Sequence, residues 1–308
     1  MNDIGDLAWA DAHAGADDHL DEIYCLTFIK GVGTEEALRR FGAFADTIAV
    51  RTPEEIGSLN NFEDGYPTMA SALGLGEWTV VFEPSGYEGA LLVAALSRGT
   101  EAFSLLRHDY AESEGGYAVD GVLITGFDPL FPNHRYGAEP DRLLPQMREV
   151  GFALGEDDDQ FDNAYSRSLR LAERFTSALP TRQQLTAPLV SAHVEPWFSD
   201  AVRPEVTGQQ VADAVAEVRR LAAKHGLTGT PGLADALAAA SESTAPVPVS
   251  PESELGRHVR AWLAEAHRAS WSLNDHRARM SEAERYRGYD LGWLTKALGT
   301  ALRTGPRG

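Results

Sequence analysis

The stretch Gly116-Tyr-Ala-Val-Asp-Gly-Val-Leu-Ile-Thr-Gly-Phe127 places two runs of strand-forming residues on either side of Asp120-Gly121. An Asp-Gly pair between such runs is a strong signal for a β-hairpin, because a two-residue type I′ turn needs left-handed backbone angles at both positions. Runs of strand length that are rich in apolar and β-branched residues recur at 23–29, 46–50, 78–82 and 101–106. The sequence therefore predicts a β-sheet in this part of the chain.

Segments with helical signals lie between the predicted strands. Helices are expected at 34–41, 87–96 and 141–150, each followed closely by a glycine, and at a further segment with Leu171, Phe175 and Leu179 on one face. Strands with interspersed helices and one hairpin predict an α+β fold with a mixed sheet.

The pattern changes near residue 200, where Glu195-Pro-Trp-Phe and Arg203-Pro204 interrupt it. From there on every predicted element is helical. The sequence therefore predicts an acidic α+β domain at 1–200 and an all-helical module at 205–308. Pro246, Pro248 and Pro251 indicate a proline-rich linker at 243–254 within this module.

Composition places the chain among ordinary globular proteins. Its 308 residues are 43% hydrophobic and 24% charged, and no apolar run has the length of a membrane span. The N-terminus lacks the basic and apolar regions of a signal peptide, and a single cysteine, Cys25, excludes an internal disulfide. We expect a cytoplasmic protein.

Charge is distributed unevenly along the chain. The formal net charge is −19, and it divides into −21 for residues 1–200 (34 acidic, 13 basic) and +2 for residues 201–308 (12 acidic, 14 basic). Phosphate groups are bound by Lys and Arg, so nucleic acid and anionic membrane surfaces are not expected partners. An acidic first domain is suited to a basic protein partner.

Three blocks occur in the order Tyr24-Cys-Leu-Thr-Phe-Ile-Lys-Gly31, Trp78-Thr-Val-Val-Phe-Glu-Pro-Ser-Gly-Tyr-Glu-Gly89 and Phe127-Asp-Pro-Leu-Phe-Pro-Asn-His-Arg-Tyr-Gly137. Together they resemble an uncharacterised actinobacterial family of unknown function, over about residues 20–198. Since that family has no established activity, the resemblance implies no catalytic residue. It supports the boundary near residue 200.

Four side chains near predicted strand ends are candidate catalytic or metal-binding residues. His108 and Asp109 follow one strand, Asp128 follows the hairpin, and His134 comes six residues later. Ends of neighbouring strands meet at one end of a sheet, so these residues form a candidate His/carboxylate site. In the alternative interpretation Asp128-Pro129 and Glu83-Pro84 are turn residues. Since no local ligand spacing is present, we expect no metal and no cofactor.

Two acidic or histidine-containing patterns have simpler explanations. The run Glu156–Asp159 lacks the ligand repeat of a calcium loop, and carboxylates before a helix stabilise its positive end. His258, His267 and His276 recur every nine residues, which places consecutive ones on opposite sides of a helix.

The last helix is apolar on two sides. At about 100° per residue, Tyr286, Tyr289 and Trp293 fall opposite a face that carries the leucines 291, 294, 298 and 302. Trp271, on the preceding helix, also lies away from its leucine stripe. Because one apolar face is enough to join a core, the aromatic residues are candidates for partner binding. The alternative is a helix buried on both sides.

These observations favour a protein without catalytic activity that acts by binding other proteins. An acidic recognition domain, of the kind found in inhibitor, immunity or defence proteins, would be followed by a helical docking or self-association module. The alternative is a metal-dependent or acid–base hydrolase that uses His108, Asp109, Asp128 and His134.

Overall fold

The computed structural model describes residues 5–13, 20, 22–59, 67–154, 162–177, 179–199, 206–242, 246–272 and 280–302. The acidic run Glu156–Asp159 lies outside these residues. Backbone contacts divide the chain into two units, Met1–Pro53 with Thr68–Ala201, and Glu54–Pro67 with Val202–Gly308. The contacts group residues 54–67 with the C-terminal helices. That residues 1–200 and 205–308 are separate domains, each able to fold alone, stays a prediction.

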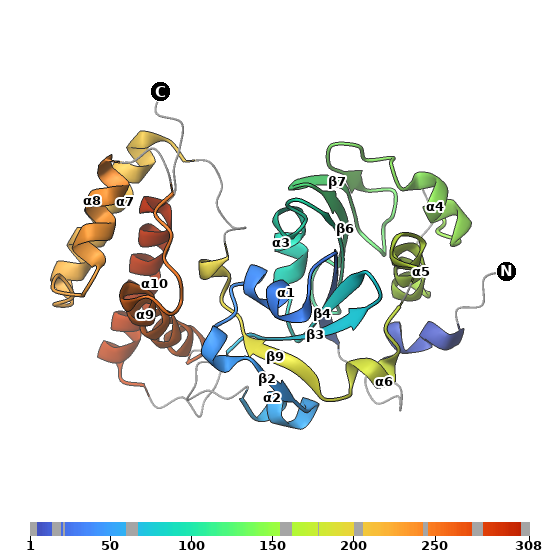
Figure 1. Ribbon diagram of the computed structural model, residues 1–308, viewed down its shortest axis with the longest axis horizontal. Helices are drawn as coiled ribbons and strands as arrows, with labels where there is room; N and C mark the ends of the chain where they lie inside the picture. The colour runs from blue at the N-terminus through green and yellow to red at the C-terminus, as the bar shows by residue number, and fades with distance from the viewer. Residues whose placement is uncertain are drawn as a thin grey trace. The chain divides into compact units, whose positions relative to one another are not determined.

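A single sheet forms the centre of the first unit (Figure 1). In the described part of the chain it has nine strands, in the order β2-β9-β3-β4-β1-β5-β6-β7-β8. The strands are β1 (Ile23–Lys30), β2 (Ala49–Arg51), β3 (Met69–Leu75), β4 (Trp78–Pro84), β5 (Glu101–His108), β6 (Glu114–Val119), β7 (Val122–Phe127), β8 (Arg135–Tyr136) and β9 (Leu189–His193). With the C-terminal helices, this sheet and its helices confirm the α+β class.

Every neighbouring pair in the sheet is antiparallel, whereas the sequence led us to expect a mixed sheet. The helix α3 (Glu88–Leu96) does connect two strands that run in the same direction, β4 and β5. However, β1 lies between them and pairs with both. A helical connection therefore gives no parallel pair here, because the two strands that it joins are not neighbours.

The predicted hairpin is present as β6 and β7. Asp120 and Gly121, between the strands, have φ angles of 47° and 84°, the left-handed values of a type I′ turn. A register shift next to Tyr117 marks a β-bulge in the same hairpin.

Helices cover both faces of the sheet. On one face α1 (Thr34–Arg40) contacts β3, β4 and β9, and α3 crosses β1, β5 and β6. On the other face the 3₁₀-helix η1 (Gly5–Ala10) packs against α5 (Ala164–Thr176), which contacts β5. The largest apolar cluster, with Tyr24, Phe28 and Phe103 at its centre, lies on this second face. Alternate residues of β1 therefore enter two different cores.

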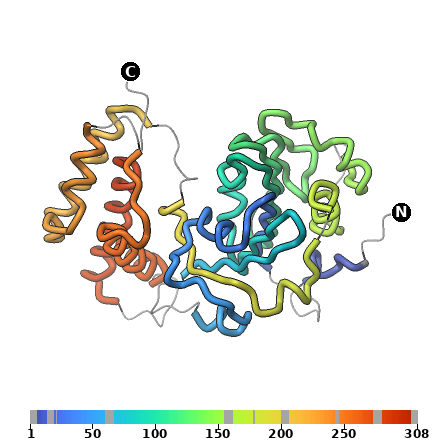
Figure 2. The backbone as a smooth tube through the Cα atoms, viewed as in Figure 1, coloured from blue at the N-terminus to red at the C-terminus, as the bar shows by residue number. Residues whose placement is uncertain are grey.

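Shorter elements complete the first unit. They are η2 (Ala45–Thr47), α4 (Leu144–Glu149), α6 (Arg182–Leu185) and η3 (Pro196–Phe198). The helix α2 (Pro53–Leu59) lies, except for Pro53, in the stretch that groups with the C-terminal helices. The strand β9 follows α6 and returns along the sheet beside β2 and β3, as the backbone trace shows (Figure 2). The hydroxyls of Ser71 and Ser191, from β3 and β9, are 2.7 Å apart in the buried interior.

Beyond residue 202, the described part of the second unit consists of the helices α7 (Gly208–Lys224), α8 (Leu233–Glu242), α9 (Glu254–Trp271) and α10 (Glu282–Ala301). Of these, α10 packs against α7 and α9. Their N-termini are capped by side chains: Thr207 and Ser281 form capping boxes at α7 and α10, and Ser253 caps α9. None of the described helices has the length and apolar character that crossing a membrane requires.

Candidate functional site

The four candidate residues lie at one end of the sheet. Because β5, β6, β7 and β8 alternate in direction, the end of β5, the start of β6, the end of β7 and the start of β8 lie side by side; Leu106 pairs with Glu114, and Phe127 pairs with both Gly115 and Arg135. His108 ends β5, Asp109 follows it, and Asp128 and His134 lie between β7 and β8. Their contacts decide whether they form a site.

Asp109 pairs with Arg107, a residue that is only 1% exposed. Both oxygens of the Asp109 carboxylate accept hydrogen bonds from Arg107, at 2.8 Å from Nε and 2.9 Å from Nη2. Arg107 Nη1 also donates to the carbonyl oxygens of Ala10 and Ala12, and the guanidinium lies 5.2 Å from the Tyr165 ring centroid. Asp109 therefore neutralises a buried cation that ties the N-terminal segment to the sheet.

His108 is held within a turn. The ring Nδ1 of His108 accepts a hydrogen bond from the backbone N–H of Tyr110 at 3.2 Å, and the backbone N–H of His108 donates to Ser113 Oγ at 3.1 Å. Because Nδ1 is an acceptor, the neutral ring carries its proton on Nε2. Nδ1 is thereby occupied.

Asp128 begins the turn that leads to β8. Its Oδ1 accepts a hydrogen bond from the Leu130 backbone N–H at 2.8 Å, which is the contact of an Asx-turn. Burial raises the pKa of Asp128, and the nearby charge of Glu112 adds to the shift. His134 stacks on Phe131, with ring centroids 6.2 Å apart.

The structure therefore places the four residues at the same end of the sheet but engages them separately. In the described ranges no group of three or more His, Cys, Asp or Glu side chains has an arrangement that suits a metal ion. Two tyrosines at this end were not singled out from the sequence. The Tyr110 hydroxyl donates to Glu22, and the Tyr136 hydroxyl donates to Glu114.

A second group of polar side chains is buried where β1 and β4 meet the first turn of α3. Cys25 on β1 pairs in register with Glu83 on β4, and neither side chain is exposed. The carboxyl oxygens of Glu83 accept hydrogen bonds from the backbone N–H groups of Glu88, at 3.0 Å, and Gly89, at 2.8 Å. Burial is the main reason that the pKa of Glu83 is raised to about 8.

In the sequence, Glu83-Pro84 resembles ordinary turn residues, so the role of this carboxyl is not evident from it. The available signal was the position of an acidic residue at the end of a strongly apolar strand and five residues before the next helix. A carboxylate close to the first N–H groups of a helix stabilises those groups, which have no partner within the helix.

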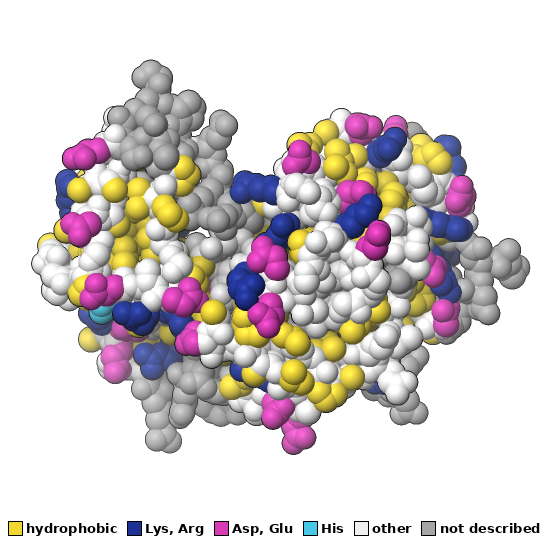
Figure 3. Space-filling model, in the orientation of Figure 1, with side chains coloured by type: hydrophobic (Ala, Val, Ile, Leu, Met, Phe, Trp, Pro, Cys, Tyr) yellow, Lys and Arg dark blue, Asp and Glu magenta, His cyan; other side chains and the backbone are white. Residues whose placement is uncertain are grey.

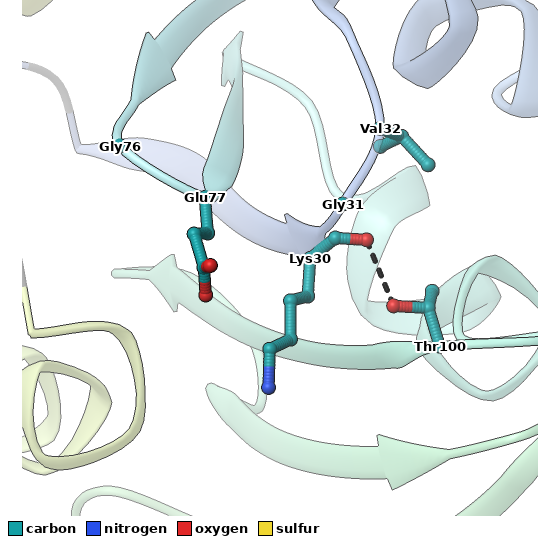
Figure 4. A pocket seen from close by; sticks show the side chains of 6 residues that line it. All are labelled: Lys30, Gly31, Val32, Gly76, Glu77 and Thr100. Carbon is teal, nitrogen blue, oxygen red and sulfur yellow. Dashed lines mark hydrogen bonds between the residues drawn. The ribbon is translucent and has the colours of Figure 1, made fainter.

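A shallow cavity of about 450 Å³ lies at the opposite end of β1 from Cys25 (Figure 4). Lys30, Gly31, Gly76, Glu77 and Thr100 line it together with Val32. Lys30 Nζ is 3.0 Å from Glu101 Oε1, and the Thr100 hydroxyl donates to the Lys30 carbonyl oxygen at 2.8 Å. The one lysine that enters this cavity is thus already paired.

Two of the three aromatic residues of α10, Tyr286 and Trp293, are exposed opposite the leucine face, as the helical spacing predicted. Leu291, Leu294 and Leu298 are fully buried, whereas Tyr286 is 62% and Trp293 is 60% exposed. Tyr289 is half-buried, with its hydroxyl inside the unit. Trp271, at the end of α9, is 45% exposed. Lys296 Nζ lies 5.1 Å from the ring centroid of Trp293.

Comparisons with known proteins give one match. No curated protein and no solved structure matches the chain. A family model described as a family of unknown function (DUF6461) matches residues 3–193, which end at the last residue of β9. The described C-terminal helices lie beyond that match. The chain therefore belongs to this family of unknown function, DUF6461.

Proposed function

We propose that the protein acts by protein–protein association, and that two copies of the chain pair through the exposed aromatic face of α10. This face consists of Tyr286 and Trp293, with Tyr289 between them. Tyr286 and Trp293 are seven residues apart, so they lie on one side of the helix and about 10 Å from each other. The observation that carries the proposal is their exposure on a helix whose leucine face is already buried.

Aromatic side chains in this position are typical of binding hot spots. Tyr and Trp present a large apolar area at a small cost in conformational entropy, and they dominate the energy of many interfaces. The stacking of Lys296 against Trp293 keeps one face of the indole beside a cation. Burying these exposed apolar side chains in an interface removes them from water and so favours association.

The distribution of charge favours a second copy of the chain as the partner of this face. Residues 1–200 carry −21 and repel the same part of another copy, whereas residues 201–308 carry only +2. The C-terminal helices are therefore the part of the chain through which two copies can approach each other with least repulsion. Added salt should strengthen the pairing, because it screens the repulsion between the acidic parts.

We also propose that the first unit binds a basic protein, because residues 1–200 carry a net charge of −21. On the face seen in Figure 3, however, Lys and Arg side chains lie among the Asp and Glu side chains of this unit. Charge alone therefore gives no single docking patch on this face. The proposal includes a cytoplasmic location.

The hydrolase alternative needs His108, Asp109, Asp128 and His134 to converge on one reacting group. The pairing of Asp109 with Arg107 and the Asx-turn at Asp128 explain two of these residues structurally. The geometry therefore supports association better than catalysis.

The test is the mass of the full-length protein in solution. Light scattering after size-exclusion chromatography should give a dimer whose fraction rises with concentration and with salt. Trp293→Ala should weaken pairing by about 2 kcal/mol or more, which is about thirtyfold in Kd. Tyr110→Ala is the matched control, since Tyr110 is an exposed aromatic residue in the other unit. A wild-type chain that stays monomeric at every concentration would refute the proposal.

A further inference from the structure

The exposed aromatic side chains of the first unit gather at one end of the sheet. Among the described residues of this unit they are Tyr87, Tyr110, Phe131 and Tyr136, which are between 40% and 73% exposed. We propose that these four residues and the carboxylates beside them, which we call the aromatic end, bind an extended segment that carries Arg or Lys side chains. The segment is part of the basic protein partner proposed above, on which this inference rests.

The order of the strands brings the four aromatic residues to the same end. Tyr87 follows the end of β4, Tyr110 follows the end of β5, and Phe131 lies between β7 and β8. Tyr136, in β8, pairs with Gly126 near the end of β7. The strands β1, β5, β6 and β7 lie between β4 and β8, which makes five strand spacings of about 4.8 Å. The aromatic end is therefore about 24 Å long, the length of about seven residues of extended chain.

Carboxylates accompany the aromatic rings. The hydroxyl of Tyr110 donates to Glu22, and the hydroxyl of Tyr136 donates to Glu114. Glu112 lies between Tyr110 and Glu114 in the chain and is exposed. In the described part of the chain, neither Glu112 nor Glu114 forms an ion pair with Lys or Arg. These carboxylates are therefore available to a cation from another molecule.

Glu112 joins the turn after β5 to the loop before β8. Burial is the main reason that the pKa of Tyr136 is raised, and the nearby charges of Asp128 and Glu112 add to the shift. The charge of Glu112 also contributes to the raised pKa of Asp128. The carboxylates thus lie close enough to one another to act on the same group.

Two arginines at this end of the sheet are paired with other carboxylates. Arg107 is buried and pairs with Asp109, and Arg135 pairs with Asp141 at 2.8 Å. Neither arginine therefore neutralises Glu112. The aromatic end keeps an excess of negative charge, which attracts a cationic ligand.

An exposed tyrosine ring next to a carboxylate suits an Arg or Lys side chain. The face of the ring attracts a cation, and the planar guanidinium of Arg also stacks on it. The carboxylate can then accept hydrogen bonds from the same cation. A neutral apolar segment would instead remove water from the carboxylates without supplying a partner, and an acidic segment would be repelled. A basic segment is therefore the occupant that both features favour.

The test uses the full-length protein and a fluorescein-labelled peptide of four Arg-Gly repeats. Alternate residues of an extended peptide face the same side, so all its arginines can contact the aromatic end. Fluorescence anisotropy should detect binding that weakens as salt is added, because the ions screen the attraction. A peptide with Gln in place of each Arg should not bind. Pairing of two chains through α10 responds to salt in the opposite direction, which distinguishes the two kinds of association.

Two substitutions remove one feature each. Tyr110→Ala should raise the Kd of the peptide about threefold, because a cation–π contact at an exposed site is lost. Glu112→Gln should raise it by a similar factor through the loss of an exposed ion pair. The double variant should bind about tenfold more weakly. Tyr110→Phe keeps the ring and should bind almost as tightly as the wild type.

Matched controls lie at the opposite end of the sheet. Glu77→Gln removes one exposed carboxylate before β4, and Val122→Ala removes exposed apolar area at the start of β7. A strand as long as β4 places these residues about 20 Å from the aromatic end. Because charges at that distance are largely screened at about 0.1 M salt, both controls should keep the Kd within about 1.5-fold of the wild type.

Hydrogen exchange of the wild-type protein locates the peptide without any substitution. Backbone amides at 109–113 and 128–134 should gain protection when the peptide is added, and those at 76–77 and 120–121 should not. Binding that the variants at 110 and 112 do not weaken, or protection confined to other segments, would overturn the aromatic end and leave the basic partner in place. A wild-type chain that binds the Arg peptide no better than the Gln peptide would overturn both.

Discussion

Replacement of Gly89 by alanine tests how closely α3 packs on the sheet. In most exposed helical positions Gly→Ala stabilises, by up to about 1 kcal/mol, because alanine has less conformational freedom to lose. At Gly89 the new methyl group would lie 2.0 Å from Thr27 Oγ1 and 2.8 Å from Glu83 Oε2. Thr27 is fully buried on the central strand β1 and has no space into which to retreat.

The expected cost follows from these distances. Overpacking of a well-packed interior costs about 1–3 kcal/mol, and a 2.0 Å approach to a β-branched side chain belongs at the upper end of that range. After about 1 kcal/mol of helix propensity is subtracted, Gly89→Ala should destabilise the first unit by about 2 kcal/mol. Thr27→Ala removes the hydroxyl at 2.0 Å, so Gly89→Ala should cost clearly less in that background, where the approach to Glu83 Oε2 at 2.8 Å remains. The coupling energy of the cycle is then on the order of 1 kcal/mol.

Urea unfolding of the full-length chain measures these differences. Tryptophan emission and labelling pulses at Cys25 together identify the transition of the first unit, because two units can unfold separately. Gly57→Ala is the control: Gly57 lies within α2 in the other unit, nothing is within 4 Å of its added Cβ, and the substitution should leave the transition of the first unit unchanged. A Gly89→Ala protein as stable as the wild type, or a cost of the same size in the Thr27→Ala background, would refute the reasoning.

Other variants test the remaining contacts. Arg107→Met should destabilise the chain by about 3 kcal/mol in urea unfolding, the lower end for a broken buried pair, because its carboxylate partner keeps some contact with water. Leu294→Ala should cost about 3 kcal/mol by cavity formation, while Trp293→Ala should change the stability of dilute, monomeric protein by less than about 1 kcal/mol. Residues 1–200 alone should be soluble and melt cooperatively; a fragment without a thermal transition would contradict the domain prediction. Elemental analysis should find no stoichiometric zinc or manganese, and one equivalent that is lost in His134→Ala would favour the hydrolase alternative.

Local patterns were sufficient to predict several elements. The Asp120-Gly121 turn and the apolar runs of β1 and β4 carry their own signals, and the structure has strands at these places. The strand β3, Met69-Ala-Ser-Ala-Leu-Gly-Leu75, was missed because its residues are small and have weak strand preference. Its place in the sheet depends on pairing with β4 and β9, which a local pattern does not contain.

In the candidate sites, too, local features could be predicted from the sequence, whereas contacts between distant segments could not. Strand ends could be placed at one end of the sheet from the order of the elements, and the leucine face of α10 from helical spacing. The pairing of Asp109 with Arg107 could not be anticipated, because arginine is rarely buried and its carbonyl partners come from a segment 95 and 97 residues away. Glu83 was missed as a buried group for a related reason: its burial depends on how α3 crosses the sheet.

The position of β9 has a consequence for synthesis on the ribosome. Both β2 and β3 hydrogen-bond to β9, and the side chains of Ser71 and Ser191 that meet in this region are 120 residues apart. A nascent chain that has emerged only as far as α6 holds β3 with one edge unpaired and β2 with no neighbour in the sheet. Unpaired edges of this kind are where chains aggregate or recruit chaperones. The sheet is thus completed only when β9 has left the ribosome. A pause in translation before β9 would prolong the time during which β3 has an unpaired edge open to aggregation.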